Sequence, residues 1–249
     1  MKKFFKWLGV IVGGLLLILV VVAWIMNEDK PTANPSPEAD ALAQKMMAAV
    51  RNDAWDTTTL VQWTFAGTHH YLWDKERNLV QVSWNENKVL LNTKTSQGIA
   101  YQDEALVVGE GSEELVRKAE EIFNNDSFWL NAPAKAFDPG TERSLVMLDD
   151  GREGLMVSYS SGGTTPGDTY VWLLDEQGLP QSWKLWVRII PVGGVEISWE
   201  GWTDLNTGAR ISTQHQSSLF TLVISNVLSA QSWSELNLTD DPFAALVNE

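Results

Sequence analysis

The sequence predicts an α+β protein, mostly antiparallel β, that follows one transmembrane helix. Three observations predict this fold class: an uncharged apolar run near the N-terminus, period-two alternation of apolar and polar residues over most of the remaining chain, and only two amphipathic stretches with helical spacing. A sheet of about ten strands does not stay flat. We therefore expect a curved, half-open barrel-like sheet with the two helices on its concave face.

The N-terminal run, residues 7–26, is long enough to cross the roughly 30 Å hydrocarbon core of a bilayer as a helix. Three lysines lie in the cytoplasmic stub 1–6 before it, and Glu28 and Asp29 follow it. The positive-inside rule then predicts a single-pass signal-anchor in the cytoplasmic membrane, with the N-terminus in the cytoplasm. A cleaved signal peptide is the alternative, but the run is longer than a signal core and ends without a small-x-small site.

Two short features flank this anchor. Gly9 and Gly13 form a small-xxx-small pair, which predicts a weak homodimer through the anchor. Residues 27–37 contain three prolines among small polar residues, so they are expected to form a semi-rigid spacer. The exported β-rich domain is then 38–249, in the periplasm or another extracytoplasmic space.

The first helix is predicted over about residues 37–52. Ser36 suits the N-cap and Pro37 the first helical position. Apolar residues follow at i, i+4, i+7 and i+8 and form one stripe: Leu42, Met46, Ala49 and Val50.

The second helix is predicted over about residues 113–124, with Ser112 as its cap. Its apolar stripe consists of Leu115, Ala119, Ile122 and Phe123. The polar run that starts at Asn124 is expected to end the helix. Phe128 and Trp129 would then lie in a segment that folds back over the mouth of the sheet as a gate.

Almost all of the rest reads as strand, because apolar residues alternate with polar ones between turn sequences rich in Gly, Asn and Asp. Four such strands place the following residues on one face: Val80, Val82 and Trp84; Leu155, Val157 and Tyr159; Val195, Ile197 and Trp199; Phe220, Leu222 and Ile224.

The order is a helix, about five strands, a second helix and about six strands. In this order and size, roughly residues 38–230 resemble the periplasmic lipoprotein-carrier superfamily, the LolA-like and LolB-like half-open barrels. The resemblance implies a curved sheet with helices over an apolar cavity. Because those shuttling carriers are cleaved and soluble, an anchored relative is expected to bind or hand over its ligand in place.

Composition and motifs exclude several classes. The chain contains no cysteine, which removes disulfides and thiol chemistry. From residue 31 onward it carries 14 basic and 30 acidic residues, a net charge of −16, so nucleic-acid binding is not expected. His69 and His70 are adjacent on a predicted strand and point to opposite faces, and His215 is the third histidine. We therefore expect no metal site, no cofactor and no enzyme.

The tryptophans are the remaining signal, since thirteen is a high number for 249 residues. Most are expected in the core. The rest suggest either an apolar pocket that holds acyl chains or an exposed platform for sugar rings. The residues proposed to bind a ligand are Phe128, Trp129, Trp183, Trp186 and Trp199.

The function predicted from these features is non-catalytic binding of an apolar or amphipathic ligand, a lipid or an acylated protein, at the bacterial inner membrane. The first alternative is a scaffold or interaction protein with a fully packed core. The second is a carbohydrate-binding module, which requires coplanar exposed tryptophans.

Overall fold

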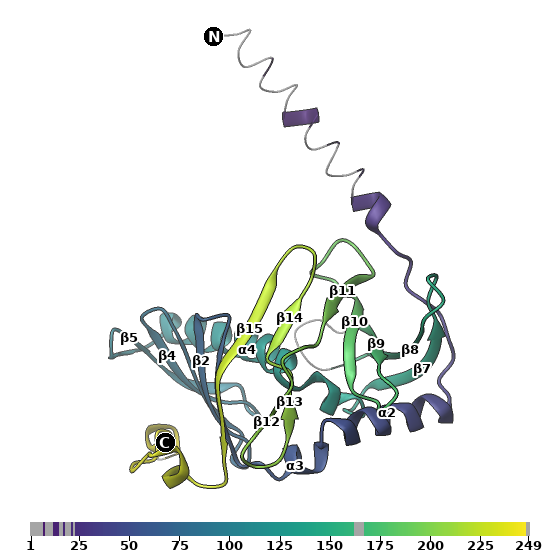
Figure 1. Cartoon of the computed structure of the whole chain (residues 1–249). Coiled ribbons are helices and arrows are strands. Elements are labelled where there is room, and N and C mark those ends of the chain that lie inside the picture. The colour runs from purple at the N-terminus through teal and green to yellow at the C-terminus, as the bar shows by residue number, and fades with distance from the viewer. Residues whose placement is uncertain are drawn as a thin grey trace.

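The computed structural model is rich in antiparallel strands, with few helices (Figure 1). It describes residues 7, 12–14, 17, 21, 23–161 and 167–247. In this part of the chain the strands form two large sheets and one short ribbon, and they do not close into a barrel. The predicted α+β class with mostly antiparallel strands is therefore confirmed.

The first sheet has eight strands. In spatial order they are β14 (Gln214–Gln216), β15 (Thr221–Ala230), β1 (Leu60–Phe65), β2 (His69–Asp74), β3 (Leu79–Trp84), β4 (Asn87–Asn92), β5 (Gln97–Gln102) and β6 (Ala105–Val107). Each neighbouring pair is antiparallel, and β1 to β6 form a meander of hairpins.

The second sheet has five antiparallel strands. In spatial order they are β11 (Val195–Ser198), β10 (Pro180–Trp186), β9 (Thr169–Leu174), β8 (Glu153–Tyr159) and β7 (Thr141–Met147). The short ribbon pairs β12 (Thr203–Asp204) with β13 (Arg210–Ile211).

The two sheets meet where β11 lies beside β14. The backbone of Glu200 forms an isolated antiparallel bridge with Gln214. The Glu200 amide donates to the Gln214 carbonyl at 2.9 Å, and the Gln214 amide donates back at 3.1 Å. The thirteen strands therefore form one array, with β6 and β7 at its two far edges.

Two short helices lie between Ser36 and the first strand. Helix α2 (Pro37–Ala49) begins as predicted, because the Ser36 side chain accepts a hydrogen bond from the Ala39 amide at 3.2 Å. Arg51 then adopts a left-handed backbone (φ 55°), which separates α2 from the single-turn helix α3 (Asn52–Asp56). The prediction of one helix to residue 52 was wrong at this end.

Helix α4 (Glu110–Asn131) is longer than predicted at both ends. It begins after Gly109, whose positive φ of 68° suits glycine, and not at Ser112. It also continues through the polar run at Asn124, so the predicted gate segment is the C-terminal half of the helix. The reason is that Asp126 and Ser127 are buried against neighbouring structure, where tertiary contacts override their low helix propensity.

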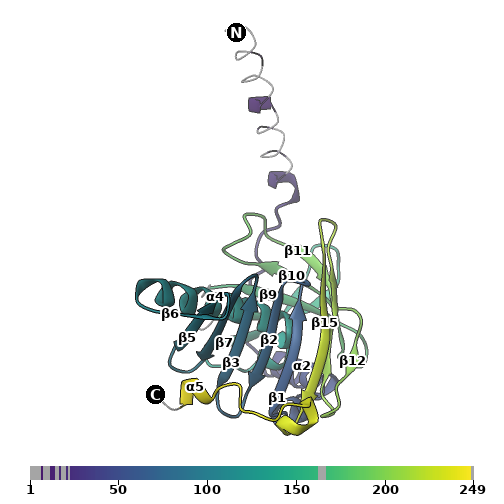
Figure 2. The same ribbon diagram turned by 90° about the vertical axis from the view of Figure 1, so that its left-hand side faces the viewer.

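Short one-turn elements complete the chain. The 3-10 helix η1 (Ala132–Lys135) follows α4 directly, and η2 (Trp233–Leu236) and α5 (Ala244–Val247) follow β15. Helix α5 lies on the side of the eight-stranded sheet that faces away from α4 (Figure 2). Phe243, just before α5, is fully buried against Leu79 and Leu90.

Each sheet packs one face against helix. On the eight-stranded sheet, alternate residues such as Val80 and Val82 pack against α4, and on the five-stranded sheet Leu155 and Val157 pack against α2. We call these the inner faces. Trp129 of α4 contacts both clusters, so α4 connects the two cores.

The spacer was predicted over residues 27–37, but α2 begins at Pro37 and residues 27–36 lie along the five-stranded sheet. Pro35 pairs with Ser144 of β7, and Ala33 packs on the outer-face cluster formed by Val146, Leu148, Met156, Val171 and Leu173. The Glu28 carboxylate lies 2.7 Å from Nζ of Lys184, whose side chain is only 9% exposed.

Among the described residues, no helix combines the length and apolar character needed to cross a bilayer. Most of the predicted anchor 7–26, including Gly9 of the proposed dimer contact, lies outside those residues.

Candidate functional site

An open cavity of about 760 Å³ lies between the inner face of the five-stranded sheet and the C-terminal half of α4. Strands β8 and β10 both run antiparallel to β9, so the end of β8 (Tyr159), the start of β9 (Tyr170) and the end of β10 lie at one end of the sheet. The cavity is at this end. Its wall continues into the β10–β11 loop through Val187, Ile189 and Ile190.

Aromatic rings form the floor of the cavity. The Phe128 ring centroid lies 5.1 Å from that of Tyr170, 5.6 Å from that of Tyr159 and 5.8 Å from that of Trp183. Trp183 in turn lies 4.6 Å from Tyr170, and Trp129 packs edge-on against Trp183 at 5.0 Å. Rings at these separations are in mutual contact, so the floor is stiff and apolar.

Side chains of both charges, together with two uncharged amides, line the cavity around this floor: Lys118, Glu121, Asn124, Asn125, Lys135, Asp138 and Asp168. Asp168 is buried and accepts a hydrogen bond from the Arg188 amide at 3.1 Å. Burial and the neighbouring Asp168 raise the pKa of Tyr170 above its ordinary value, so its phenol is neutral. The site is therefore amphipathic, with an apolar base beneath charged groups.

Of the five residues proposed from the sequence, Phe128, Trp129 and Trp183 line this cavity. Trp199 is buried behind Trp183, with ring centroids 5.0 Å apart. Trp186 is on the outer face, where its indole N–H donates to the Glu28 carbonyl at 2.9 Å. The structure thus brings together three of the five, and Trp186 is covered by the N-terminal segment.

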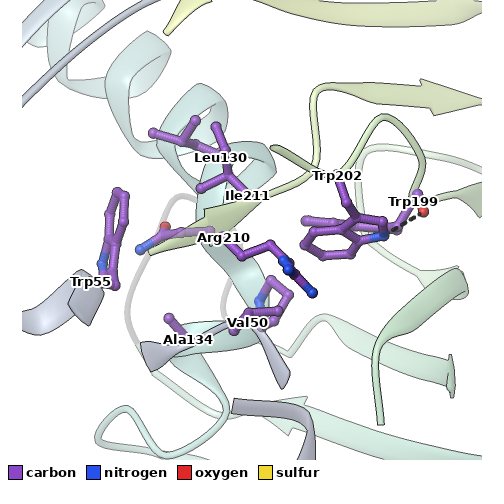
Figure 3. Close-up of a pocket in the computed structure, with 10 residues that line it drawn as sticks. Val50, Trp55, Leu130, Ala134, Trp199, Trp202, Arg210 and Ile211 are labelled. Carbon is purple, nitrogen blue, oxygen red and sulfur yellow. Dashed lines mark hydrogen bonds between the residues drawn. The ribbon is translucent and has the colours of Figure 1, made fainter. Parts of the chain in front are cut away.

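Trp199 faces a small pocket where side chains from α3, α4 and β13 pack together (Figure 3). There Trp55 of α3, Leu130 of α4 and Ile211 of β13 approach Trp199 and Trp202 around a void of about 10 Å³. A void of this size holds about one water molecule. The indole of Trp202 donates to the Trp199 carbonyl at 3.1 Å and stacks on its ring, so neither forms a free platform for a sugar.

His215 is fully buried between two of these indoles. Its ring centroid is 4.4 Å from that of Trp199 and 5.2 Å from that of Trp129. Burial lowers the pKa of His215 to about 4, since the charged imidazolium would lose its hydration there. It is therefore a neutral core residue at pH 7.

The other two histidines face different partners, as their adjacency predicts. His69 Nδ1 lies 2.7 Å from Oδ2 of the buried Asp126, and the Tyr71 hydroxyl donates to the same oxygen at 2.5 Å. His70 instead contacts the Thr64 hydroxyl at 3.0 Å. Within the described residues no group of three or more His, Asp or Glu side chains is arranged to hold a metal ion.

Sequence reasoning missed the cavity residues Tyr159, Tyr170 and Leu185. Period-two alternation contained the signal for two of them, because it places Tyr159 with Leu155 and Leu185 with Trp183. Strand pairing, which the alternation does not reveal, brings these faces together. Asp126, Tyr71 and His69 were also missed as a cluster, since 55 and 57 residues separate the carboxylate from its partners.

Comparison with known proteins gives little further information. The chain matches no protein-family model, and no curated protein matches it. A solved structure that matches is that of a DUF1329 family protein from Desulfovibrio piger, with 11% sequence identity and a TM-score of 0.38. The match covers 79% of this chain and 93% of that one. The resemblance is distant, and no function follows from it.

Proposed function

We propose that this protein is anchored in the bacterial inner membrane by residues 7–26 and binds one apolar or amphipathic ligand in its extracytoplasmic domain. The ligand is a lipid or an acylated protein, and the protein performs no chemistry on it. The observation that carries this proposal is the open cavity of about 760 Å³ with an aromatic floor. Ligand pockets commonly occupy 300–1,000 Å³ and are mostly apolar with a few polar groups.

The lining fits an acyl chain better than a flat or charged ligand. Phe128, Trp183 and Leu185 present carbon surface in the interior, where burying each methylene of a ligand contributes about 0.8 kcal/mol. The charged groups around the floor suit a polar headgroup. In this proposal the array is the half-open barrel expected from the sequence, and α2 and α4 lie on its concave face.

Photo-cross-linking of the full chain tests the proposal. The protein is reconstituted into phosphatidylcholine vesicles that contain phosphatidylcholine with a diazirine near the end of one acyl chain. After irradiation and digestion at lysine, we expect label on the α4 peptide 119–135 as well as on the anchor. The anchor label is the internal standard, because it reports contact with bulk lipid alone.

Two Val→Glu variants, one in the cavity and one outside it, test whether the label on 119–135 comes from lipid in the cavity. Val187→Glu places a carboxylate on the cavity wall and should reduce the label on 119–135 at least tenfold relative to the anchor. Val223→Glu makes the same change at an exposed position of β15 and should leave the label unchanged. Label confined to the anchor in the unaltered chain would overturn the proposal. Competition by an N-acylated peptide but not by free phosphatidylcholine would identify an acylated protein as the ligand.

A further inference from the structure

Two loops of the domain expose large apolar side chains. Ile189 in the β10–β11 loop (residues 187–194) is 70% exposed. Leu219 and Phe220, in the β14–β15 turn (residues 217–220), are 79% and 42% exposed. We call these three residues the apolar tips.

Strand directions place the tips at one end of the domain. Strand β11 leads away from the first loop and lies beside β14, where the Gln216 amide donates to the Ser198 hydroxyl at 3.0 Å. Because the Glu200–Gln214 bridge is antiparallel, β14 runs back toward the β10–β11 loop. The β14–β15 turn, which follows β14, therefore lies near that loop. Both views show the two loops projecting at the same end of the domain (Figures 1 and 2).

The N-terminal segment enters the domain at this same end. The Gly193 amide donates to the Asn27 side chain at 2.9 Å, and the Glu28 amide donates to the Gly193 carbonyl at 3.1 Å. Met26, the last residue of the apolar run, directly precedes Asn27. Since one residue spans at most about 3.6 Å, the end of the run lies within a few ångströms of the β10–β11 loop.

We propose that this end of the domain rests on the outer surface of the membrane, with Ile189, Leu219 and Phe220 inserted among the lipid headgroups. The occupant of the apolar tips is thus the bilayer itself. This inference rests on the proposed anchoring of residues 7–26, and it does not depend on occupation of the cavity.

The charge of the domain determines the kind of contact. With a net charge of −16 from residue 31 onward, the domain is repelled by anionic lipid. Contact must therefore come from apolar insertion, which zwitterionic lipid supports and salt does not weaken. Such contact would also orient the open end of the cavity, whose wall includes Ile189, toward the lipid that it is proposed to receive.

Site-directed fluorescence on the full chain tests the inference. The chain lacks cysteine, so single substitutions carry an environment-sensitive fluorophore without background. Labels at Ile189→Cys and Leu219→Cys report the tips, and one at Leu17→Cys reports the anchor. Asn206→Cys is the control, because its neighbour Thr207 bonds Ser229 near the far end of β15, roughly 30 Å from Phe220 at about 3.3 Å per residue.

The labelled chains are reconstituted into phosphatidylcholine vesicles with and without doxyl-labelled lipid. We expect quenching of at least twofold at positions 17, 189 and 219, none at 206, and no change at the tips when salt is raised to about 1 M. Quenching at 17 with none at 189 and 219 would overturn the inference and leave the anchor intact. No quenching at 17 would overturn the anchor, and the inference with it.

Discussion

Replacing Tyr71 with phenylalanine removes one hydrogen bond that holds α4 on the eight-stranded sheet. Both Tyr71 and Asp126 are 2% exposed, and the hydroxyl lies 2.5 Å from Oδ2 of Asp126. Burial and the adjacent Asp126 raise the pKa of Tyr71 well above its ordinary value, so the phenol donates at every pH at which the protein is folded. The ring itself stays, stacked on Trp63 at 4.3 Å.

The magnitude follows from the bonds that remain. After the substitution Oδ2 still accepts from His69 at 2.7 Å, and Oδ1 still accepts from Asn125 at 2.8 Å. The Asp126 carboxylate therefore loses the bond from Tyr71 but keeps those from His69 and Asn125. One hydrogen bond to a charged group contributes about 1.5–3 kcal/mol to the free energy of unfolding. At about 2–4 °C per kcal/mol for a chain of this size, Tm should fall by roughly 3–12 °C.

The assay is urea unfolding of the full chain in a mild detergent, followed by tryptophan fluorescence, with a thermal scan beside it. Tyr101→Phe is the matched control, because Tyr101 is half-buried on β5 and its hydroxyl has no partner among the described residues. Its free energy of unfolding should change by less than about 0.5 kcal/mol. If Tyr71→Phe is as mild as this control, the Asp126 contact does not hold the helix, and the explanation for the length of α4 is refuted.

Two further predictions concern buried ionisable groups. Burial lowers the pKa of His215 to about 4, below about 6.5 in the unfolded chain, so the unfolded state binds more protons between these values. Stability should therefore rise by up to about 3 kcal/mol from pH 4 to pH 6.5. His215→Gln should flatten this profile in urea titrations at each pH. The second prediction concerns the ion pair of Lys184, which Glu28→Gln leaves buried without its carboxylate partner. The substitution should cost about 1–2 kcal/mol, less than a fully buried pair because Glu28 is 39% exposed. Lys184→Met, which removes the buried charge, should cost less than Glu28→Gln; the reverse order in the same unfolding assay would contradict this reasoning.

Alternation predicted the faces of several strands, and cap chemistry predicted the start of α2 but not that of α4. Ser36 caps α2, and the faces predicted for β3, β8 and β11 are the faces that pack inward. These features depend on residues close in sequence. The predicted end of helix α4 near Asn124 was wrong for the opposite reason. Asp126 bonds His69 and Tyr71, which are distant in sequence, and residues 124–127 alone do not reveal that contact.

In the candidate site too, near-sequence features could be predicted and those that depend on distant contacts could not. Trp183 and Trp186 are three residues apart, and period two puts such residues on opposite faces of a strand, as the structure has them on β10. Alternation gave no means of deciding which face has free volume beside it. That depends on Glu28, 158 residues before Trp186, which covers the outer indole, and on α4, which stands over Trp183 and leaves the cavity between them.

The contacts of residues 27–36 change what an anchor can do. A free Pro-rich spacer would tether the domain and let it rotate, because such a chain fixes distance more than direction. Here Gly193 bonds both Asn27 and Glu28, Lys184 pairs with Glu28, and Pro35 pairs with β7. The segment is thus attached along the outer face of the sheet whose inner face forms the cavity wall. Any membrane helix that continues from Met26 would therefore orient the cavity as well as tether it, and loosening the segment through Glu28→Gln should disturb lipid contact at Ile189 before it disturbs the fold.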